Sequence, residues 1–177
     1  MKVGIMQPYF LPYIGYFQLI ASVDLFIVYD NIKYTKKGWI NRNRMLQNGK
    51  DVVFSLPLKK DSDALDVIQR NLAADFKRDK LLSAWKEAYS RAPYFEPTFA
   101  LLERIVRHPE QNLFRFIHHA IEQTCAYLGI ETKIQISSSI AVDHMLKSEV
   151  KVLAICQAVG AIVYVITIGG MDLNSKD

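Results

Sequence analysis

The stretch that decides the fold of this chain is residues 1–30, which read MKVGIMQPYFLPYIGYFQLIASVDLFIVYD. Two short apolar runs, residues 3–6 and 25–29, lie on either side of a helix-sized segment. Short continuous apolar runs bounded by turn residues are typical of buried strands in a parallel sheet. The stretch therefore predicts a β–α–β unit, whose crossover is right-handed in nearly all proteins.

The turn after the first apolar run carries polar groups at the place where open α/β sheets bind ligands. Its hydrogen-bonding side chains are Gln7, Tyr9, Tyr13, Tyr16 and Gln18. Gly15 lacks a Cβ, so a ligand or another backbone can approach closely there. The alternative is an aromatic helix whose tyrosines only half-bury their rings.

Length and composition predict one globular domain, residues 1–177, with a core that needs no disulfide or metal. A net charge of +4 indicates mild attraction to anions but not the dense basic stripe of a nucleic-acid binder. Cys125 and Cys156 lie in apolar helical patterns without metal spacing, so we expect buried free thiols. We find no signal-peptide pattern, and the apolar stretch 159–168 is too short for a membrane span. We therefore expect a soluble, cytoplasmic protein.

A basic segment, residues 31–44, follows the second apolar run. It interleaves cations with aromatic and amide side chains: Lys33, Tyr34, Lys36, Lys37, Trp39, Asn41, Arg42, Asn43 and Arg44. Arginine binds a phosphate bidentately and lysine binds it as a point charge, so the segment favours binding of an anionic group. A solvated basic loop around one packed tryptophan, or an RNA-binding segment, are the alternatives.

The remaining elements are predicted from periodicity and turn residues. Asn48-Gly49 predicts a hairpin between residues 45–47 and a strand 52–58. Residues 67–72 form a further short strand candidate, and helices are expected over 76–91, 96–108 and 112–128, with Gly129 as the stop. The three histidines near these helices (His108, His118 and His119) lack metal-pair spacing, which favours structural or surface roles. A strand 132–136, a helix 145–158 and a strand 161–168 ending in Gly169-Gly170 complete the chain.

A serine cluster, Ser137 to Ser139, follows the predicted strand 132–136. Serines are common helix N-caps, and helix N-termini collect anions through their free N–H groups. The cluster is therefore a second candidate for phosphate binding. The alternative is that these serines only cap and turn the chain.

These motifs resemble the WbqC-like protein family. The resemblance is carried by residues 6–17 (MQPYFLPYIGYF), Asp30, residues 38–44 (GWINRNR), residues 88–95, residues 136–139 (ISSS) and residues 168–170 (IGG). It implies a transferase or ligase of surface-polysaccharide (O-antigen, lipopolysaccharide) biosynthesis that attaches glycine or an acyl group to an amino sugar. Val150 and Ile166 depart from the family pattern, which has Arg and Asn there, and the chain ends before an expected last strand. We therefore expect a C-terminally truncated member.

A looser resemblance links the first β–α–β unit to nucleotidyltransferase-like enzymes, with Tyr13 and Tyr16 in place of the two histidines that grip ATP phosphates. It implies an α/β fold with a three-layer parallel sheet, a Rossmann-like core and a helical insertion around residues 76–129. Replacing histidine with tyrosine keeps a hydrogen-bond donor but removes the group that titrates near neutral pH.

The combined hypothesis assigns catalytic roles to five residues, Gln7, Tyr13, Tyr16, Asp30 and Arg42. Substrate or phosphate binding is assigned to Tyr9, Gly15, Lys36, Lys37, Trp39, Asn41, Asn43, Arg44, Ser137, Ser138, Ser139, Gly169 and Gly170. No metal ligand set is assigned, and the candidate cofactor is ATP with Mg²⁺, which Asp30 could hold. The expected partner is a nucleotide or nucleotide-sugar rather than a nucleic acid, and homo-oligomer formation is left open. The alternative function is a non-catalytic protein that binds a nucleotide-sugar or another ligand of the same pathway.

Overall fold

The computed structural model of the chain describes residues 1–166, so the predicted Gly169-Gly170 turn lies outside the described residues. The chain forms two compact units. Unit 1 comprises Met1–Pro8, Pro12–Ile32 and the described part of Gly129–Asp177, and unit 2 comprises Tyr9–Leu11 and Lys33–Leu128. That residues 1–177 form a single domain stays a prediction.

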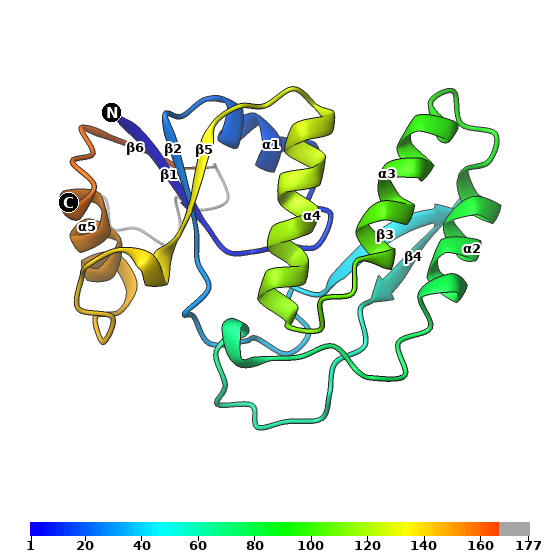
Figure 1. The fold of residues 1–177 in the computed structure, drawn as a ribbon, viewed down its shortest axis with the longest axis horizontal. Helices are drawn as coiled ribbons and strands as arrows, with labels where there is room; N and C mark the ends of the chain where they lie inside the picture. Colours follow the sequence, from blue (N-terminus) through cyan, green and yellow to red (C-terminus); the bar gives the residue numbers. More distant parts are fainter. Residues whose placement is uncertain (167–177) are drawn as a thin grey trace. The chain divides into compact units, whose positions relative to one another are not determined.

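Unit 1 is built on a parallel sheet of four strands: β1 (Lys2–Met6), β2 (Leu25–Val28), β5 (Lys133–Ile136) and β6 (Val163–Val165). Their order across the sheet is β5-β2-β1-β6. Figure 1 labels the four strands, which cross in that view because the sheet is seen nearly edge-on. Helix α1 (Ile14–Ala21) connects β1 to β2. The predicted β–α–β unit is therefore confirmed.

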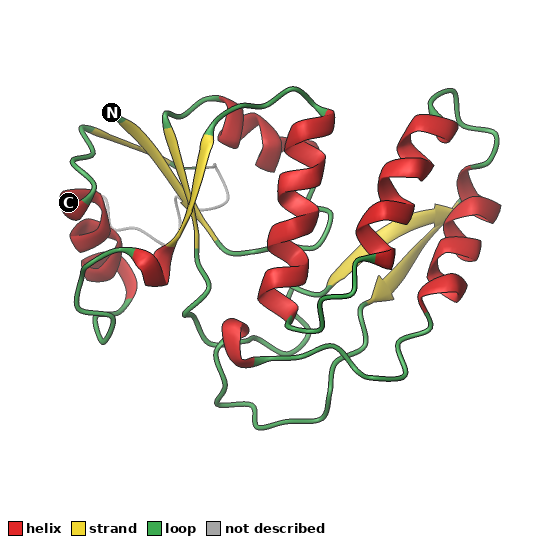
Figure 2. Cartoon of the chain, in the orientation of Figure 1, coloured by secondary structure: helices red, strands yellow, loops and turns green. Residues whose placement is uncertain are grey.

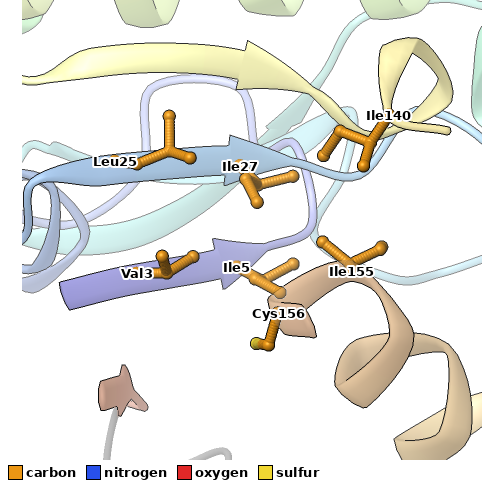
Figure 3. Close-up of a cluster of buried hydrophobic side chains, with 7 residues drawn as sticks. All are labelled: Val3, Ile5, Leu25, Ile27, Ile140, Ile155 and Cys156. Atoms are coloured by element: carbon orange, nitrogen blue, oxygen red, sulfur yellow. The ribbon is translucent and has the colours of Figure 1, made fainter. Parts of the chain in front are cut away.

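The two faces of this sheet are covered by different helices. Val3 and Ile5 of β1 and their neighbours on β2 pack with Ile140 and with Ile155 of α5 (Ser148–Ala158), as Figure 3 shows. On the opposite face, a Cβ added at Gly4 would lie 3.2 Å from the ring of Phe26 and 3.5 Å from Leu19 of α1. Because side chains alternate between the faces of a strand, this arrangement makes three layers, helix on sheet on helix.

Unit 2 combines one hairpin with helices, shown by type in Figure 2. Strands β3 (Arg42–Gln47) and β4 (Lys50–Ser55) pair antiparallel across Asn48 and Gly49, whose φ angles are +51° and +73°. Positive φ at both central residues is the requirement of a type I′ turn, so the predicted Asn-Gly hairpin is confirmed. The helices are α2 (Arg78–Tyr89), α3 (Phe95–Arg107) and α4 (Leu113–Tyr127). Residues 1–166 thus hold five α-helices, and the mixed α/β class is confirmed.

Helix α4 begins and ends as its sequence predicts. The Asn112 side chain accepts a hydrogen bond from the Arg115 N–H at 3.1 Å, which caps the first turn. Gly129, with φ +67°, takes the left-handed conformation just beyond the last turn. Both signals are local, which is why the sequence reveals them.

Three sequence predictions need correction. The proposed strand 67–72 is instead a 3₁₀ helix, Val67–Gln69, because Asp66 and Gln69 form a capping box that curls the backbone. The strand predicted over 52–58 ends at Ser55, two residues before Pro57, which has no N–H for a sheet ladder. The helix predicted from residue 145 begins at Ser148.

Candidate functional site

A buried carboxylate joins the carboxyl ends of two neighbouring strands of unit 1. Val28 pairs with Ile136, so Asp30 and Ser137 emerge together at this edge. Asp30 is 1% exposed. Its Oδ1 accepts hydrogen bonds from Ser137 Oγ at 2.8 Å and Ser138 N at 2.9 Å, and its Oδ2 accepts one from Ser138 Oγ at 2.6 Å. Asp30 therefore holds the serine turn, Ser137–Ser139, in place.

Asn31 links this carboxylate to a buried lysine. Lys151, on α5, is 6% exposed and donates from Nζ to Asn31 O at 3.2 Å and to Asn31 Oδ1 at 3.0 Å. Ser137 Oγ lies 2.9 Å from the same Oδ1, and His144 Nδ1 lies 2.9 Å from Asn31 Nδ2. We call these six residues the carboxyl-edge cluster: Asp30, Asn31, Ser137, Ser138, His144 and Lys151.

An aromatic ring, that of Tyr29, lies against the Lys151 ammonium. The Lys151 ammonium lies 5.4 Å from the centroid of the Tyr29 ring, within the range of a cation–π contact. Burial, followed by the nearby Tyr164 and Cys156, raises the pKa of Tyr29 to about 12. The phenol therefore stays protonated at neutral pH, and its ring offers a neutral face to the cation.

The turn after β1 places its polar residues in different surroundings. Tyr16 is fully buried, with its ring against Phe26, and its hydroxyl donates to Gln7 O at 3.0 Å. Tyr13, in contrast, is 64% exposed, and Gln7 is exposed too. A Cβ at Gly15 would lie 2.2 Å from the Tyr13 ring, so the missing side chain lets that ring lie across the first turn of α1. The space beside Gly15 is therefore filled by the Tyr13 side chain and is not open to a ligand.

The basic segment lies in unit 2, where its arginines flank a tryptophan. The guanidinium carbons of Arg42 and Arg44 lie 5.3 and 5.2 Å from the centroid of the Trp39 ring, which is 45% exposed. Arg42 also donates to Gly38 O at 2.9 Å and to Lys37 O, and Arg44 forms an ion pair with Asp51 at 2.6 Å. This arrangement places two cations against one partly exposed aromatic ring.

The amides of the same segment hold backbone. Asn41 Oδ1 accepts from the Tyr34 hydroxyl at 2.9 Å, and its Nδ2 donates to Leu56 O at 2.8 Å. Asn43 Nδ2 donates to Phe10 O at 3.1 Å and to Leu11 O. Asn43 thereby secures the turn that contains the half-buried Tyr9. These amides have structural partners that the sequence did not reveal.

The lysines of the basic segment are exposed. Lys36 pairs with Asp63 at 2.7 Å, which lowers the pKa of that carboxyl. Lys37 has a positive φ of +62°. An exposed pair of this kind contributes little to stability and exchanges readily for another anion.

Within residues 1–166, no group of three or more histidine, cysteine or acidic side chains is arranged to hold a metal ion. The rings of His108 and His119 stack at a centroid distance of 3.8 Å, and His118 Nδ1 lies 3.3 Å from Glu122. Cys125 and Cys156 are free and buried, as predicted, and burial raises the pKa of Cys125 to about 11. In the same part of the chain, no helix has both the length and the apolar character for a membrane crossing.

The structure sorts the sequence candidates into two groups. Asp30, Ser137 and Ser138 meet in unit 1. The same unit holds five more candidates: Gln7, Tyr13, Gly15, Tyr16 and Ser139. Ser139 Oγ donates to Ile136 O at 2.7 Å. The other candidates from the described residues belong to unit 2: Tyr9, Lys36, Lys37, Trp39, Asn41, Arg42, Asn43 and Arg44. The hypothesis that both groups share one anion site stays a prediction.

The sequence reasoning missed Asn31, His144 and Lys151. Lys151 left one signal, because it is a lone cation within the apolar run VKVL of residues 150–153. Asn31 directly follows Asp30 but gave no separate signal.

The fold and this cluster define an α/β protein with polar side chains gathered at the carboxyl edge of a parallel sheet. The sequence model of the WbqC-like protein family matches residues 7–177, and the chain belongs to this family. It is 32% identical over 137 residues to an uncharacterized protein of Mycobacterium tuberculosis (strain ATCC 25618 / H37Rv), Rv1507c. That match covers 75% of this chain and 58% of the relative, so the chain spans just over half of the relative's length. No solved structure gives a significant match.

Proposed function

We propose that this protein is a nucleotide-dependent transferase or ligase of surface-polysaccharide biosynthesis, which attaches glycine or an acyl group to an amino sugar. The observation that carries the proposal is the carboxyl-edge cluster, with Lys151 as its buried cation. Family membership and the parallel sheet support the same conclusion.

The location of the cluster favours a small-molecule ligand. In open α/β sheets, ligands bind outside the carboxyl ends of the strands. Gln7 follows β1, Asp30 follows β2 and Ser137 follows β5, so three neighbouring strands direct polar groups to this edge. A buried polar network of this kind fixes backbone positions, which preorganises a binding site.

The proposed reaction proceeds in two steps. A carboxylate oxygen of the amino acid attacks the α-phosphorus of ATP, the bond to the β-phosphate oxygen breaks, and pyrophosphate leaves. The amine of the amino sugar then attacks the carbonyl carbon of the acyl-adenylate, AMP leaves, and the amine gives up a proton to water. Both steps move negative charge onto a departing phosphate, so fixed cations and hydrogen-bond donors accelerate them.

In this proposal the residues of unit 1 have different roles. Gln7 and Tyr13, both exposed, contact the substrate. Asp30 and Ser137 are positioning residues, because their polar atoms bind one another. Lys151 supplies positive charge at the edge. Mg²⁺, where the nucleotide carries it, would accompany the phosphates.

The test is pyrophosphate release with ATP, a panel of amino acids that includes glycine, and a panel of amino sugars. We expect release that requires ATP and an amino acid, and that continues beyond one equivalent per chain only when an amino sugar is present. Tyr13→Phe should reduce the rate without loss of structure. The control is Tyr127→Phe, at another exposed tyrosine, in unit 2, which should leave the rate unchanged. Absence of release across the panels, or equal rates for the two variants and wild type, would overturn the proposal.

A non-catalytic ligand-binding protein of the same pathway is the second candidate. It is favoured by the ion pairs and backbone contacts that occupy several cations of the basic segment. Thermal stabilisation by UDP- or dTDP-sugars without any effect of ATP would support this alternative. A separate comparison of Arg42→Ala with wild type tests whether the basic segment binds the same ligands.

A further inference from the structure

An aromatic cavity lies between helices α2 and α3 of unit 2. The function proposed above does not use it. Its volume is about 280 Å³. It is lined by Trp85, Tyr89, Ala92, Pro93, Tyr94, Phe95, Thr98, Phe99 and Leu102. An apolar cavity of about 150 Å³ holds one benzene molecule, so this cavity is large enough for two fused rings.

The walls of the cavity favour a flat guest. The rings of Phe95 and Phe99 stack at a centroid distance of 5.0 Å with 25° between their planes. Trp85, 3% exposed, is held edge-to-face by Phe54 at 5.4 Å. Rings fixed in this way offer faces and edges for offset or edge-to-face stacking on another aromatic ring.

A second, smaller cavity adjoins the first and is more polar. Its volume is about 150 Å³, and it shares Trp85, Tyr89 and Leu102 with the larger cavity. Asn43 and Arg44 line only the smaller one. Among the described residues that line either cavity, Arg44 is the one charged side chain.

Arg44 can bind an anion in the smaller cavity while it keeps its ion pair with Asp51. Its ion pair with Asp51 uses Nη1, and a guanidinium has five N–H donors in all. The guanidinium carbon lies 5.2 Å from the centroid of the Trp39 ring, within the range of a cation–π contact. Tyr89, which lines both cavities, is held in place because its hydroxyl accepts the Leu46 N–H at 2.9 Å.

We propose that these two cavities form one binding site for a small aromatic carboxylic acid. The flat apolar body lies between Tyr89 and Phe99 in the larger cavity, and the carboxylate lies in the smaller cavity against Arg44. A nucleobase fits this lining poorly, because its polar edges would lose hydrogen bonds to water and find few partners among these walls.

Calorimetric titration of the full chain with naphthalene-2-carboxylate tests the site. We expect saturable binding with one molecule per chain. Naphthalene-2-carboxamide, of the same shape without the charge, should bind about tenfold more weakly, because a charge-assisted hydrogen bond is lost. The saturated decalin-2-carboxylate, which keeps the charge but is not flat, should also bind more weakly.

Matched variants locate the binding. Ala92→Trp places a large ring at an exposed position of the cavity lining and should abolish binding, whereas Ala100→Trp, exposed on α3 outside the lining, should not. Arg44→Gln should lower the affinity for the acid to that for the amide, while Arg42→Gln, which removes the other arginine on Trp39, should not. Circular dichroism checks that each variant is folded.

The proposal is overturned if naphthalene-2-carboxylate does not bind saturably, or if the acid and the amide bind equally well. It is also overturned if Ala92→Trp and Ala100→Trp bind the acid with the same affinity. None of these results depends on whether the protein releases pyrophosphate, so this site and the proposed function fail or stand separately.

Discussion

Removal of the Ser138 hydroxyl should destabilise unit 1 more than removal of the neighbouring Ser139 hydroxyl. Ser138 Oγ lies 2.6 Å from Asp30 Oδ2, within the range of a charge-assisted O–H···O⁻ bond. Ser139 Oγ donates at 2.7 Å to a neutral acceptor, the carbonyl oxygen of Ile136. Both serines are exposed, and Ser139 Oγ also accepts a long bond from Gln135 Nε2 at 3.5 Å, so the charge of the acceptor is the main difference between them.

The size of the effect follows from these acceptors. Hydrogen bonds to charged groups contribute about 1.5–3 kcal/mol, and neutral ones contribute about 0.5–1.5 kcal/mol. Solvent screening places Ser138 near the lower end, so we expect Ser138→Ala to cost about 1.5–2 kcal/mol and Ser139→Ala about 0.5–1 kcal/mol. With a urea dependence of about 2 kcal/mol/M, the unfolding midpoints should differ by about 0.5 M.

The assay must report on unit 1. Both tryptophans, Trp39 and Trp85, belong to unit 2, so their fluorescence follows the other part of the chain. Hydrogen exchange of the β2 and β5 amides, measured at increasing urea concentration, gives a signal from unit 1. A double-mutant cycle with Asp30→Asn should show a coupling energy of about 1 kcal/mol between Asp30 and Ser138. Equal midpoints for Ser138→Ala and Ser139→Ala, with no coupling, would refute the reasoning.

Three further predictions concern unit 2. Gly49→Ala should cost about 1 kcal/mol, because φ is +73° and a Cβ there has no neighbour within 4 Å to compensate for the strain; urea unfolding followed by tryptophan fluorescence checks this, and an unchanged midpoint would contradict it. Asn112→Ala should cost about 1–2 kcal/mol, since it removes both the α4 cap and the 2.6 Å bond to Ile68 O. Asn112→Ser, which keeps a cap oxygen, should cost less in the same assay, and equal losses for Asn112→Ala and Asn112→Ser would contradict this prediction. Burial, and then the adjacent His108, lower the pKa of His119, so the folded state binds a proton there less readily than the unfolded state does. The free energy of unfolding should therefore fall as the pH drops below about 6.5. His119→Gln should lose less stability than wild type between pH 7.5 and 5.

Much of the fold was predictable because its signals are local. The apolar runs of residues 3–6 and 25–29 identify β1 and β2, Asn48-Gly49 identifies a type I′ hairpin, and Gly129 marks a helix end. Each signal depends on backbone conformations or side-chain periods within a few residues. The strand predicted over residues 67–72 failed because a local capping box favoured a 3₁₀ turn over the apolar pattern.

By itself, the sequence determined the α/β class, the parallel β–α–β unit and the residue types available for chemistry. Only the tertiary structure decided which of those residues meet. Asp30 and Ser137 are 107 positions apart, and they touch because β2 and β5 are neighbours in the sheet although unit 2 separates them along the chain. Strand order is set by which apolar faces pack together over the whole sheet, and hydrogen bonds between buried polar groups depend on that order. The same reason hid Lys151, whose partner Asn31 lies 120 positions away.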